Sequence, residues 1–160
     1  MNQQLDNFDR HILHLLQQSN RTTSDVIAEQ VGLSAAAVQR RIKRLRQQQI
    51  IQADISVVNP KSVGQHLTLV VQVNLERERV DLMDSFKKAM LQHPNVQQCY
   101  YVTGNTDFIL IVTAMDMTDY EDFTREAFFD NDNVRSFTTN VVMDPTKVGL
   151  SIPILNVAPK

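Results

Sequence analysis

Residues 22–48 read TTSDVIAEQVGLSAAAVQRRIKRLRQQ, a pattern that predicts two short helices joined by a tight turn. The first helix carries Val26, Ile27 and Val31 as an apolar stripe, at the spacing by which a helix buries one face. Gly32 lets the backbone turn sharply, and the hydroxyl of Ser34 is a good N-cap for the second helix. This stretch therefore predicts a helix-turn-helix.

The second of these helices is strongly basic. Val38, Ile42 and Leu45 continue the buried stripe. The remaining sides carry five cations, which are Arg40, Arg41, Lys43, Arg44 and Arg46. A solvated helix face is one interpretation of such a pattern. No Asp or Glu lies between Ser34 and Ile51, however, so the helix lacks the i,i+4 ion pairs typical of a solvated face. The pattern favours a recognition helix that enters the major groove of DNA.

Several side chains of this segment are candidates for DNA contacts. Small residues at the start of the second helix allow its backbone to approach base edges. Arg40, Arg41, Lys43 and Arg44 are expected mostly to neutralise phosphates. Gln pairs with adenine and Arg with guanine, so Gln39 and Arg40 are also the candidates for base readout. The predicted DNA-binding set is Thr23, Ser34, Ala35, Ala36, Gln39, Arg40, Arg41, Lys43 and Arg44. Two subunits would present two such helices, which predicts double-stranded DNA with an imperfect palindrome as the partner.

The charge of the 160-residue chain is unevenly distributed. The formal net charge is −2, and the hydrophobic and charged contents of 42% and 21% are typical of a soluble globular protein. Residues 1–60 hold seven Lys/Arg against five Asp/Glu, a net charge of +2. Residues 61–160 hold the other nine Lys/Arg and thirteen Asp/Glu, a net charge of −4. This asymmetry predicts a basic binding module joined to an acidic body.

The composition also predicts what the protein lacks. Cys99 is the only cysteine, so we expect neither a disulfide framework nor a zinc cluster. The polar N-terminus has no signal-peptide pattern, and no apolar run approaches the ~18 residues of a membrane span. We therefore expect a cytoplasmic protein with no membrane partner, no metal site and no cofactor.

The chain predicts an α+β protein with two domains. A helix from about residue 6 to residue 18 would complete a three-helix (winged-type) helix-turn-helix domain over residues 1–52. Residues 53–64 are expected to be a linker that begins with a β-branched strand and is broken at Asn59-Pro60. Because a lone strand needs a partner, a second subunit is its simplest supplier.

Residues 65–160 alternate between strand and helix patterns. Strands are predicted over 67–75, 96–103, 107–114 and 134–143, and helices over 80–92 and 118–129. The order βαββαβ is that of a ferredoxin-like domain, with four antiparallel strands and both helices on one face. Apolar residues on both faces of the strands predict that the open face packs against a second subunit. The apolar tail over residues 148–155 is expected to dock on the body or on a neighbour.

Short sequence motifs are spread over nearly the whole chain. They are Leu5-Asp6-x-x-Asp9-Arg10-x-Ile12-Leu13, Asn20-Arg21, Ile27-Ala28-Glu29-x-Val31-Gly32-Leu33-Ser34, Arg40-Arg41-Ile42-Lys43-Arg44-Leu45, Asn59-Pro60, Val63-Gly64, Pro94-x-Val96, Val102-Thr103-Gly104-Asn105-Thr106-Asp107-Phe108 and Val134. In this order and spacing the chain resembles the Lrp/AsnC family of transcription regulators. The resemblance implies a linker strand paired across a homodimer, and dimers that assemble into tetramers, octamers or larger rings. It also implies a DNA-binding regulator whose binding or assembly responds to a small effector, usually an amino acid.

The motif near residue 104 has two interpretations. Its pattern alone predicts a hairpin turn, in which Gly104 and Asn105 adopt positive φ. The family resemblance implies that this loop lines an effector pocket between dimers. Asp107 would then hold an α-ammonium group, and loop N–H groups with threonine hydroxyls would hold an α-carboxylate. The candidate effector-binding set is Thr103, Gly104, Asn105, Thr106, Asp107, Thr138 and Thr139.

Two departures from the family pattern concern the basic helix. Gln49 stands where the family usually has glycine, and Ala35-Ala36-Ala37 stand where relatives often have larger residues. Base readout would then depend on few side chains. Two other functions stay open, namely an enzyme and a nucleoid-organising protein that binds DNA with little sequence preference. The enzyme is disfavoured because no nucleophile–base pair, metal cluster or phosphate loop is recognisable.

Overall fold

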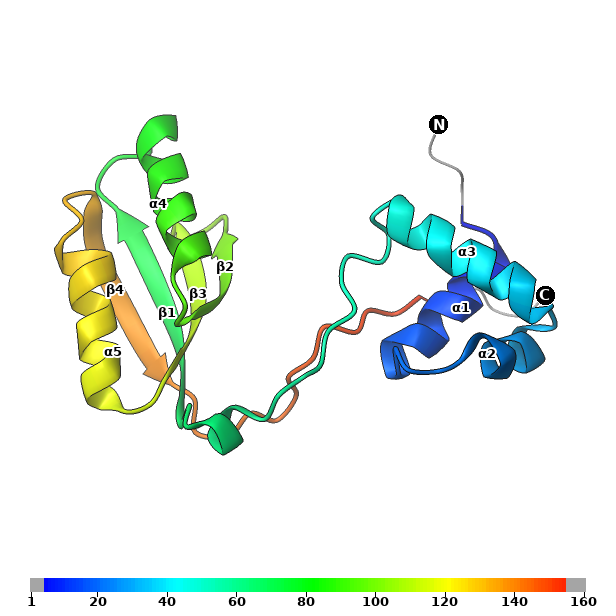
Figure 1. Ribbon diagram of the computed structural model, residues 1–160. Coiled ribbons are helices and arrows are strands. Elements are labelled where there is room, and N and C mark those ends of the chain that lie inside the picture. Colours follow the sequence, from blue (N-terminus) through cyan, green and yellow to red (C-terminus); the bar gives the residue numbers. More distant parts are fainter. Residues whose placement is uncertain (1–4, 155–160) are drawn as a thin grey trace. The chain divides into compact units, whose positions relative to one another are not determined.

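Three helices form the N-terminal part of the chain in the computed structural model, which describes residues 5–154 (Figure 1). They are α1 (Asn7–Gln18), α2 (Ser24–Val31) and α3 (Ala35–Gln47). The described residues divide into two units. The helical unit comprises residues 5–57 and 147–154, and the sheet unit comprises residues 58–146. The two units are described separately.

The helical unit is built as the pattern of residues 22–48 predicts, except that Val26 of the predicted stripe is 44% exposed and Ala28 is buried instead. Gly32 adopts the left-handed conformation (φ 74°), and its N–H donates to the carbonyl of Ala28 at the end of α2. The Ser34 hydroxyl accepts a hydrogen bond from the N–H of Ala37 and so caps α3. The buried core of the unit is formed by Ile12, Leu13, Ile27, Ala28, Val31, Val38, Ile42 and Leu45.

The end of α3 shows how the chain accommodates Gln49. This residue is the one non-glycine residue of the described part with positive φ, at 57°. Its N–H donates to the carbonyl of Arg46, and the N–H of Ile50 donates to the carbonyl of Leu45. These two bonds are those of a Schellman motif, which normally has glycine at the left-handed position. Glutamine therefore forms the same helix exit as glycine would, under backbone strain.

Replacing Gln49 with glycine is expected to stabilise the helical unit. A left-handed L-residue carries about 1–2 kcal/mol of strain, and the larger backbone entropy that glycine loses offsets part of it, leaving a gain of about 0.5–1 kcal/mol. Urea unfolding followed by far-UV circular dichroism measures this gain. Gln48→Gly is the matched control, because Gln48 has φ −85° and needs no left-handed residue. A midpoint for Gln49→Gly at or below that of the wild type would contradict the prediction.

The sheet unit has the predicted βαββαβ order and is preceded by a short 3₁₀ turn at Pro60–Val63. Its elements are β1 (Leu67–Leu75), α4 (Val80–Gln92), β2 (Val96–Tyr101), β3 (Phe108–Ala114), α5 (Met117–Thr124), a π-helical segment (Arg125–Phe129) and β4 (Val134–Val141). The sheet order is β2-β3-β1-β4, and all neighbouring strands are antiparallel. This arrangement confirms the predicted ferredoxin-like fold.

Both helices of this unit cover one face of its sheet (Figure 1). Alternate residues of the two central strands, Leu69 to Leu75 in β1 and Phe108 to Ala114 in β3, are buried on that face with Phe86 and Met90 of α4. Residues between them, such as Val70 and Ile111, lie on the open face. The two faces follow from the alternation of side chains along a strand.

The structure differs from the prediction at several segment boundaries. β2 and β4 end two residues early, and α5 begins at Met117 with Asp116 as its N-cap. Residues 53–58 have no strand partner within this single chain, and no strand that could be a wing lies within residues 5–57.

The C-terminal tail belongs to the helical unit and not to the second domain of residues 65–160 that the sequence predicts. The side-chain amide of Gln17 donates to the carbonyl of Ile152 (3.0 Å) and accepts from its N–H (2.9 Å). Ile154 packs against the helical core. The tail therefore docks on α1, and the last predicted tail residue, Leu155, lies outside the described residues.

Candidate nucleic-acid interface

Two of the five cations of α3 are bound by carboxylates of α1. Arg41 Nη1 lies 2.7 Å from Asp6 Oδ2 and 2.8 Å from Asp9 Oδ1, and Arg44 Nη2 lies 2.6 Å from Asp9 Oδ2. Asp9 is 1% exposed and is the one charged residue that is buried within residues 5–154. Because unpaired buried charges are strongly destabilising, this carboxylate and the two guanidinium groups depend on one another.

Hydrogen bonds shift the pKa values of Asp6 and Arg41 in this cluster. Burial acts to raise the pKa of Asp6, but the N–H of Asp9 and the guanidinium of Arg41 outweigh it and lower that pKa. Bonds to Asp9 and Asp6 raise the pKa of Arg41. A carboxyl group whose pKa is lower in the folded than in the unfolded state stabilises the fold at pH values above its unfolded pKa. This stabilisation is lost as the pH falls through its folded pKa. Asp6 and Arg41 are therefore both charged at neutral pH.

The other three cations of α3 differ in whether they form an ion pair. Arg46 makes a two-bond ion pair with Asp54, with Nε at 2.9 Å from Oδ2 and Nη2 at 3.1 Å from Oδ1. Arg40 and Lys43 are exposed and form no ion pair with any residue in the range 5–154. These two side chains carry the uncompensated positive charge of the helix.

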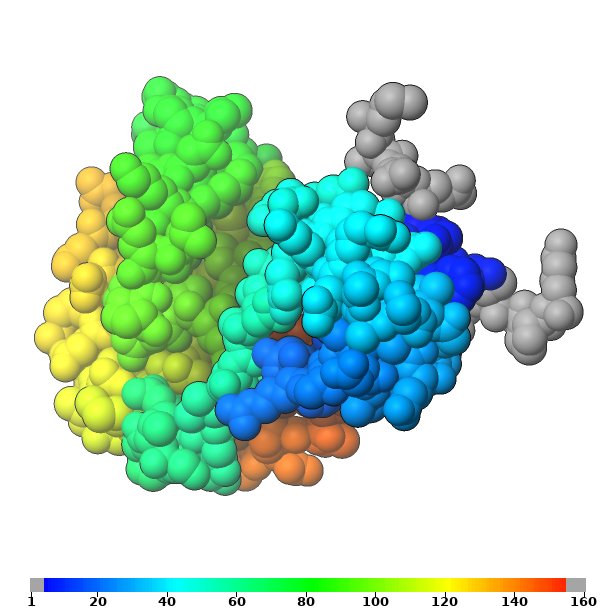
Figure 2. All heavy atoms as spheres, turned by 45° about the vertical axis from the view of Figure 1, so that its right-hand side comes forward, coloured from blue at the N-terminus to red at the C-terminus, as the bar shows by residue number. Residues whose placement is uncertain are grey.

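The position of these side chains follows from helix geometry. Successive residues of a helix are rotated by about 100°, so Lys43 and Arg46 share one flank with Gln39, Arg41 and Arg44 share the other flank, and Arg40 lies between. Side chains of α2 and α3, blue to cyan in Figure 2, lie next to each other at the surface.

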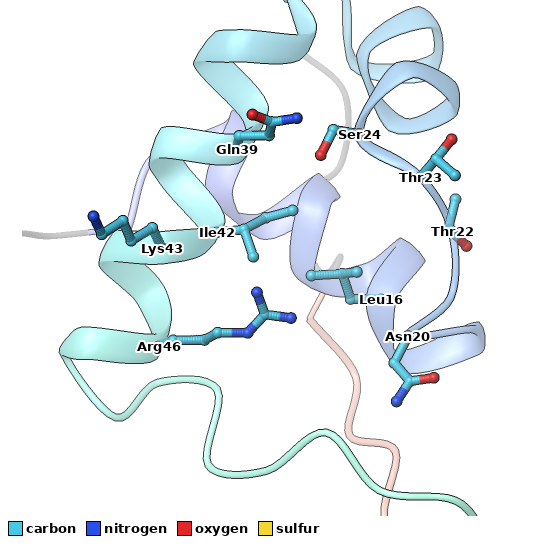
Figure 3. A pocket seen from close by; sticks show the side chains of 9 residues that line it. All are labelled: Leu16, Asn20, Thr22, Thr23, Ser24, Gln39, Ile42, Lys43 and Arg46. Carbon is cyan, nitrogen blue, oxygen red and sulfur yellow. The ribbon is translucent and has the colours of Figure 1, made fainter.

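A shallow hollow of about 300 Å³ lies on the Gln39 flank of α3. In Figure 3, Gln39 and Arg46 extend from α3 toward the chain that leads into α2. The lining residues are Leu16, Asn20, Thr22, Thr23, Ser24, Gln39, Ile42, Lys43 and Arg46. A second hollow of about 220 Å³ on the other flank is lined by Arg40, Arg41 and Arg44. Hydroxyl, amide and guanidinium groups of this kind bind phosphates and base edges.

The structure places the predicted DNA-binding residues in two groups. Ser34, Ala36, Gln39, Arg40 and Lys43 are exposed on α3 or at its start, and Thr23 is exposed at the N-cap of α2. Ala35 packs against the helical core, and Arg41 and Arg44 are turned partly toward α1.

Sequence reasoning missed the three carboxylate partners of α3. A signal for one of them was present, because Asp9 occupies the apolar stripe of α1 together with Leu5, Ile12 and Leu16. A carboxylate at such a position indicates a buried counter-charge.

The predicted effector loop is attached to the end of β1. The Thr106 hydroxyl donates to the carbonyl of Val73 (2.9 Å), and Asp107 Oδ2 accepts from the N–H of Leu75 (2.6 Å). Thr103, Gly104 and Asn105 are exposed. Gly104 has the predicted positive φ, at 123°, but Asn105, for which a positive φ was also predicted, does not. The carboxylate of Asp107 therefore already has a structural partner.

Thr138 and Thr139 point to opposite faces of the sheet. Thr139 lies opposite buried Val71 and shares a hydrogen bond with the hydroxyl of Tyr120 on the helix-covered face. Burial raises the pKa of that tyrosine, and the bond to Thr139 acts against the rise. Thr138 lies opposite exposed Gln72 on the open face. Within one chain, these two hydroxyls therefore cannot face the same ligand.

Residues 5–154 carry neither a metal-binding cluster nor a helix that could span a membrane. No group of three or more His, Cys, Asp or Glu side chains there could hold a metal ion. None of the helices in this range is both long and apolar enough to cross a bilayer. Cys99 is half-buried, and burial raises the pKa of its thiol, which favours the unreactive form.

Comparison with known proteins identifies relatives of both units. Residues 5–46 match the AsnC-type helix-turn-helix domain, and residues 68–152 match the Lrp/AsnC ligand binding domain. A helix-turn-helix-type transcriptional regulator of Sinorhizobium fredii is 50% identical over 151 residues, covering 94% of this chain and 89% of that protein. The leucine-responsive regulatory protein of Escherichia coli is 31% identical over 143 residues, covering 89% of this chain and 87% of that protein.

A solved structure is similar over the whole chain. It is a transcriptional regulator of Neisseria meningitidis in complex with L-methionine, with a TM-score of 0.89 and 27% sequence identity, and the match covers 97% of this chain and 100% of that one. The relatives named here are transcriptional regulators and not enzymes.

Proposed function

Because the chain belongs to the Lrp/AsnC family of transcriptional regulators, with a helix-turn-helix DNA-binding domain and a ligand-binding domain, we propose that it binds specific DNA sites under the control of an amino-acid effector. The observation that carries the DNA-binding part is the uncompensated charge of Arg40 and Lys43 beside exposed Gln39. Cations with no protein partner are free to neutralise phosphates, and the amide can read a base edge.

The proposed DNA-binding form is a homodimer. The open face of the sheet carries half-buried Val70, Ile109 and Ile111 at its centre, with Tyr100 and Thr138 beside them. Apolar residues at the centre of a surface with polar neighbours are typical of a protein interface. A two-fold dimer would present two copies of α3 to half-sites about 34–36 Å apart, which requires an imperfect palindrome. Larger assemblies of such dimers are part of the proposal.

The effector is proposed to bind at the loop of residues 103–107. The exposed backbone around Gly104 supports this assignment, because N–H groups of such a turn can receive a carboxylate. L-Methionine is the first ligand to try, since the Neisseria meningitidis regulator is known as a complex with it. An effector acts on DNA binding only through different affinities for two states of the assembly.

Single substitutions of the two unpaired cations test DNA binding. Arg40→Ala and Lys43→Ala are each expected to weaken binding about 10-fold or more, since each contact contributes about 1–3 kcal/mol, and to lower the salt slope by about 0.9 per lost phosphate contact. Fluorescence anisotropy with a duplex from the region upstream of the chain's own gene measures both quantities. Lys88→Ala removes an exposed cation from α4 and is the matched control. Unchanged affinity in both α3 variants would overturn the assignment of this helix.

The small residues at the start of α3 favour a second candidate, a DNA organiser with little sequence preference. Ala36 and its neighbours offer no polar atom to a base, so few side chains remain for direct readout. Footprinting on the same upstream region separates the two functions. A bounded footprint with two phased half-sites supports the specific regulator, and uniform protection supports the organiser.

A further inference from the structure

The buried carboxylate of Asp9 connects two arginines of the recognition helix. Each oxygen serves a different guanidinium, with Oδ1 bound to Arg41 and Oδ2 bound to Arg44. Arg41 is also held by Asp6 and lies over the ring of Phe8, at 5.5 Å from its centroid. Two side chains that are normally flexible are therefore fixed on the Arg41 flank of α3.

These guanidinium groups are held on one side and open on the other. Arg41 uses only Nη1 and Arg44 only Nη2 for their bonds to carboxylates, and their side chains are 22% and 31% exposed. The second terminal nitrogen of each group makes no hydrogen bond within residues 5–154, and Nε of Arg44 is buried there without a partner. Together with Arg40 the two groups line the hollow of about 220 Å³.

The charge and position of this hollow match one DNA phosphate. Three arginines and the two carboxylates behind them leave a net charge of +1, the opposite of the charge of one phosphate. The major groove is about 12 Å wide and a helix with its side chains is about 10–12 Å across, so the flanks of an inserted helix meet the backbone and not the base edges.

We propose that Asp9 is a positioning residue for DNA binding, which orients Arg41 and Arg44 so that with Arg40 they bind one backbone phosphate in this hollow. The inference rests on the proposed DNA-binding function and extends it to a residue of α1. Pre-ordered guanidinium groups lose less side-chain entropy when a phosphate binds, and each offers its free terminal nitrogen to a phosphate oxygen. Asp9 itself does not contact the DNA.

The direction in which Asp9→Asn changes the affinity for DNA distinguishes a positioning role from a general effect of charge. Asp9→Asn removes a negative charge from the DNA-binding unit, so charge alone predicts tighter binding to DNA. Loss of positioning predicts weaker binding, because the two guanidinium groups lose their common anchor. A merely structural role would reduce the folded fraction, but it would leave the number of phosphate contacts of the folded molecules unchanged.

The experiment measures binding of the full chain to a random-sequence duplex of about 30 bp by anisotropy over a series of KCl concentrations. We expect Asp9→Asn to raise Kd about 5- to 10-fold at low salt and to lower the salt slope by about 0.9 per subunit, which is one phosphate contact. Asp54→Asn is the matched control, since it makes the same change beside the exposed pair with Arg46. That variant is expected to bind as tightly as the wild type or tighter.

Two milder variants keep the inference testable when Asp9→Asn does not fold, which thermal unfolding reveals. Arg41→Lys keeps the charge but loses the planar donors, and Asp6→Asn changes a carboxylate that is 47% exposed and bonds only Arg41 among the cations. Both are expected to weaken binding about 2- to 5-fold with a reduced salt slope.

Two results would count against the inference and the function separately. Unchanged or tighter binding by a folded Asp9→Asn, or by both milder variants, with the wild-type slope would overturn the role of Asp9. A wild-type chain that binds no duplex would instead overturn the proposed function.

Discussion

Replacing Ile111 with aspartate is expected to dissociate the proposed dimer and to weaken binding to a duplex with two half-sites at least about 100-fold. The reason is that linking two binding units raises their overall affinity by a factor of about 10²–10⁴. Ile111 lies near the centre of the open sheet face, opposite Val70 of β1 and Gln98 of β2. A carboxylate buried there would lie without a counter-charge in each subunit. The neighbouring core residues Leu110 and Val112 point to the other face, so the fold should persist.

Sedimentation velocity measures the assembly state, and anisotropy with one and two half-sites measures binding. Ser85→Asp adds the same charge to the exposed surface of α4 and should change neither quantity. A dimeric Ile111→Asp, or a monomer that binds two half-sites as tightly as the wild type, would contradict the proposed interface.

Replacing Gly104 with arginine is expected to abolish effector binding at the loop of residues 103–107. A Cβ atom at this position would meet no heavy atom within 4 Å in the single chain, so the large side chain would occupy the space in front of the loop. The φ of 123° also strains any L-residue by about 1–3 kcal/mol.

Gly104→Ala carries the same backbone strain without filling the space, and is therefore the control. Calorimetry with each of the twenty amino acids should show a ligand for the wild type, weaker binding of that ligand by Gly104→Ala, and none by Gly104→Arg. A gel shift with and without the ligand should lose its response only in Gly104→Arg. Equal heats for the wild type and the arginine variant would place the effector site elsewhere.

Local patterns were sufficient to predict most of the fold. The bounds of β1 and α4 agree with their prediction to the residue, because the apolar run of β1 gives way to charged residues and the helical stripe of α4 ends just before Pro94. The same holds for the turn at Gly32 and the cap at Ser34, which depend on interactions within four residues.

The roles of the α3 cations could not be predicted in the same way. Arg41 and Asp9 are 32 residues apart, and Arg44 and Asp6 belong to the same cluster, so only the packing of α1 on α3 brings them together. The absence of acidic residues within the helix says nothing about carboxylates from other elements. For Thr138 and Thr139, two adjacent threonines fit either face equally well, and only the register with β1 assigns their directions.

The return of the tail to α1 gives the helical unit two connections to the rest of the chain instead of one. The first connection is made by residues 52–57 and the second by residues 147–152, where the Gln17 side chain forms two hydrogen bonds with the backbone of Ile152. Loss of the two bonds between Gln17 and Ile152 would therefore weaken one of the two segments by which the helical unit is joined to the rest of the chain.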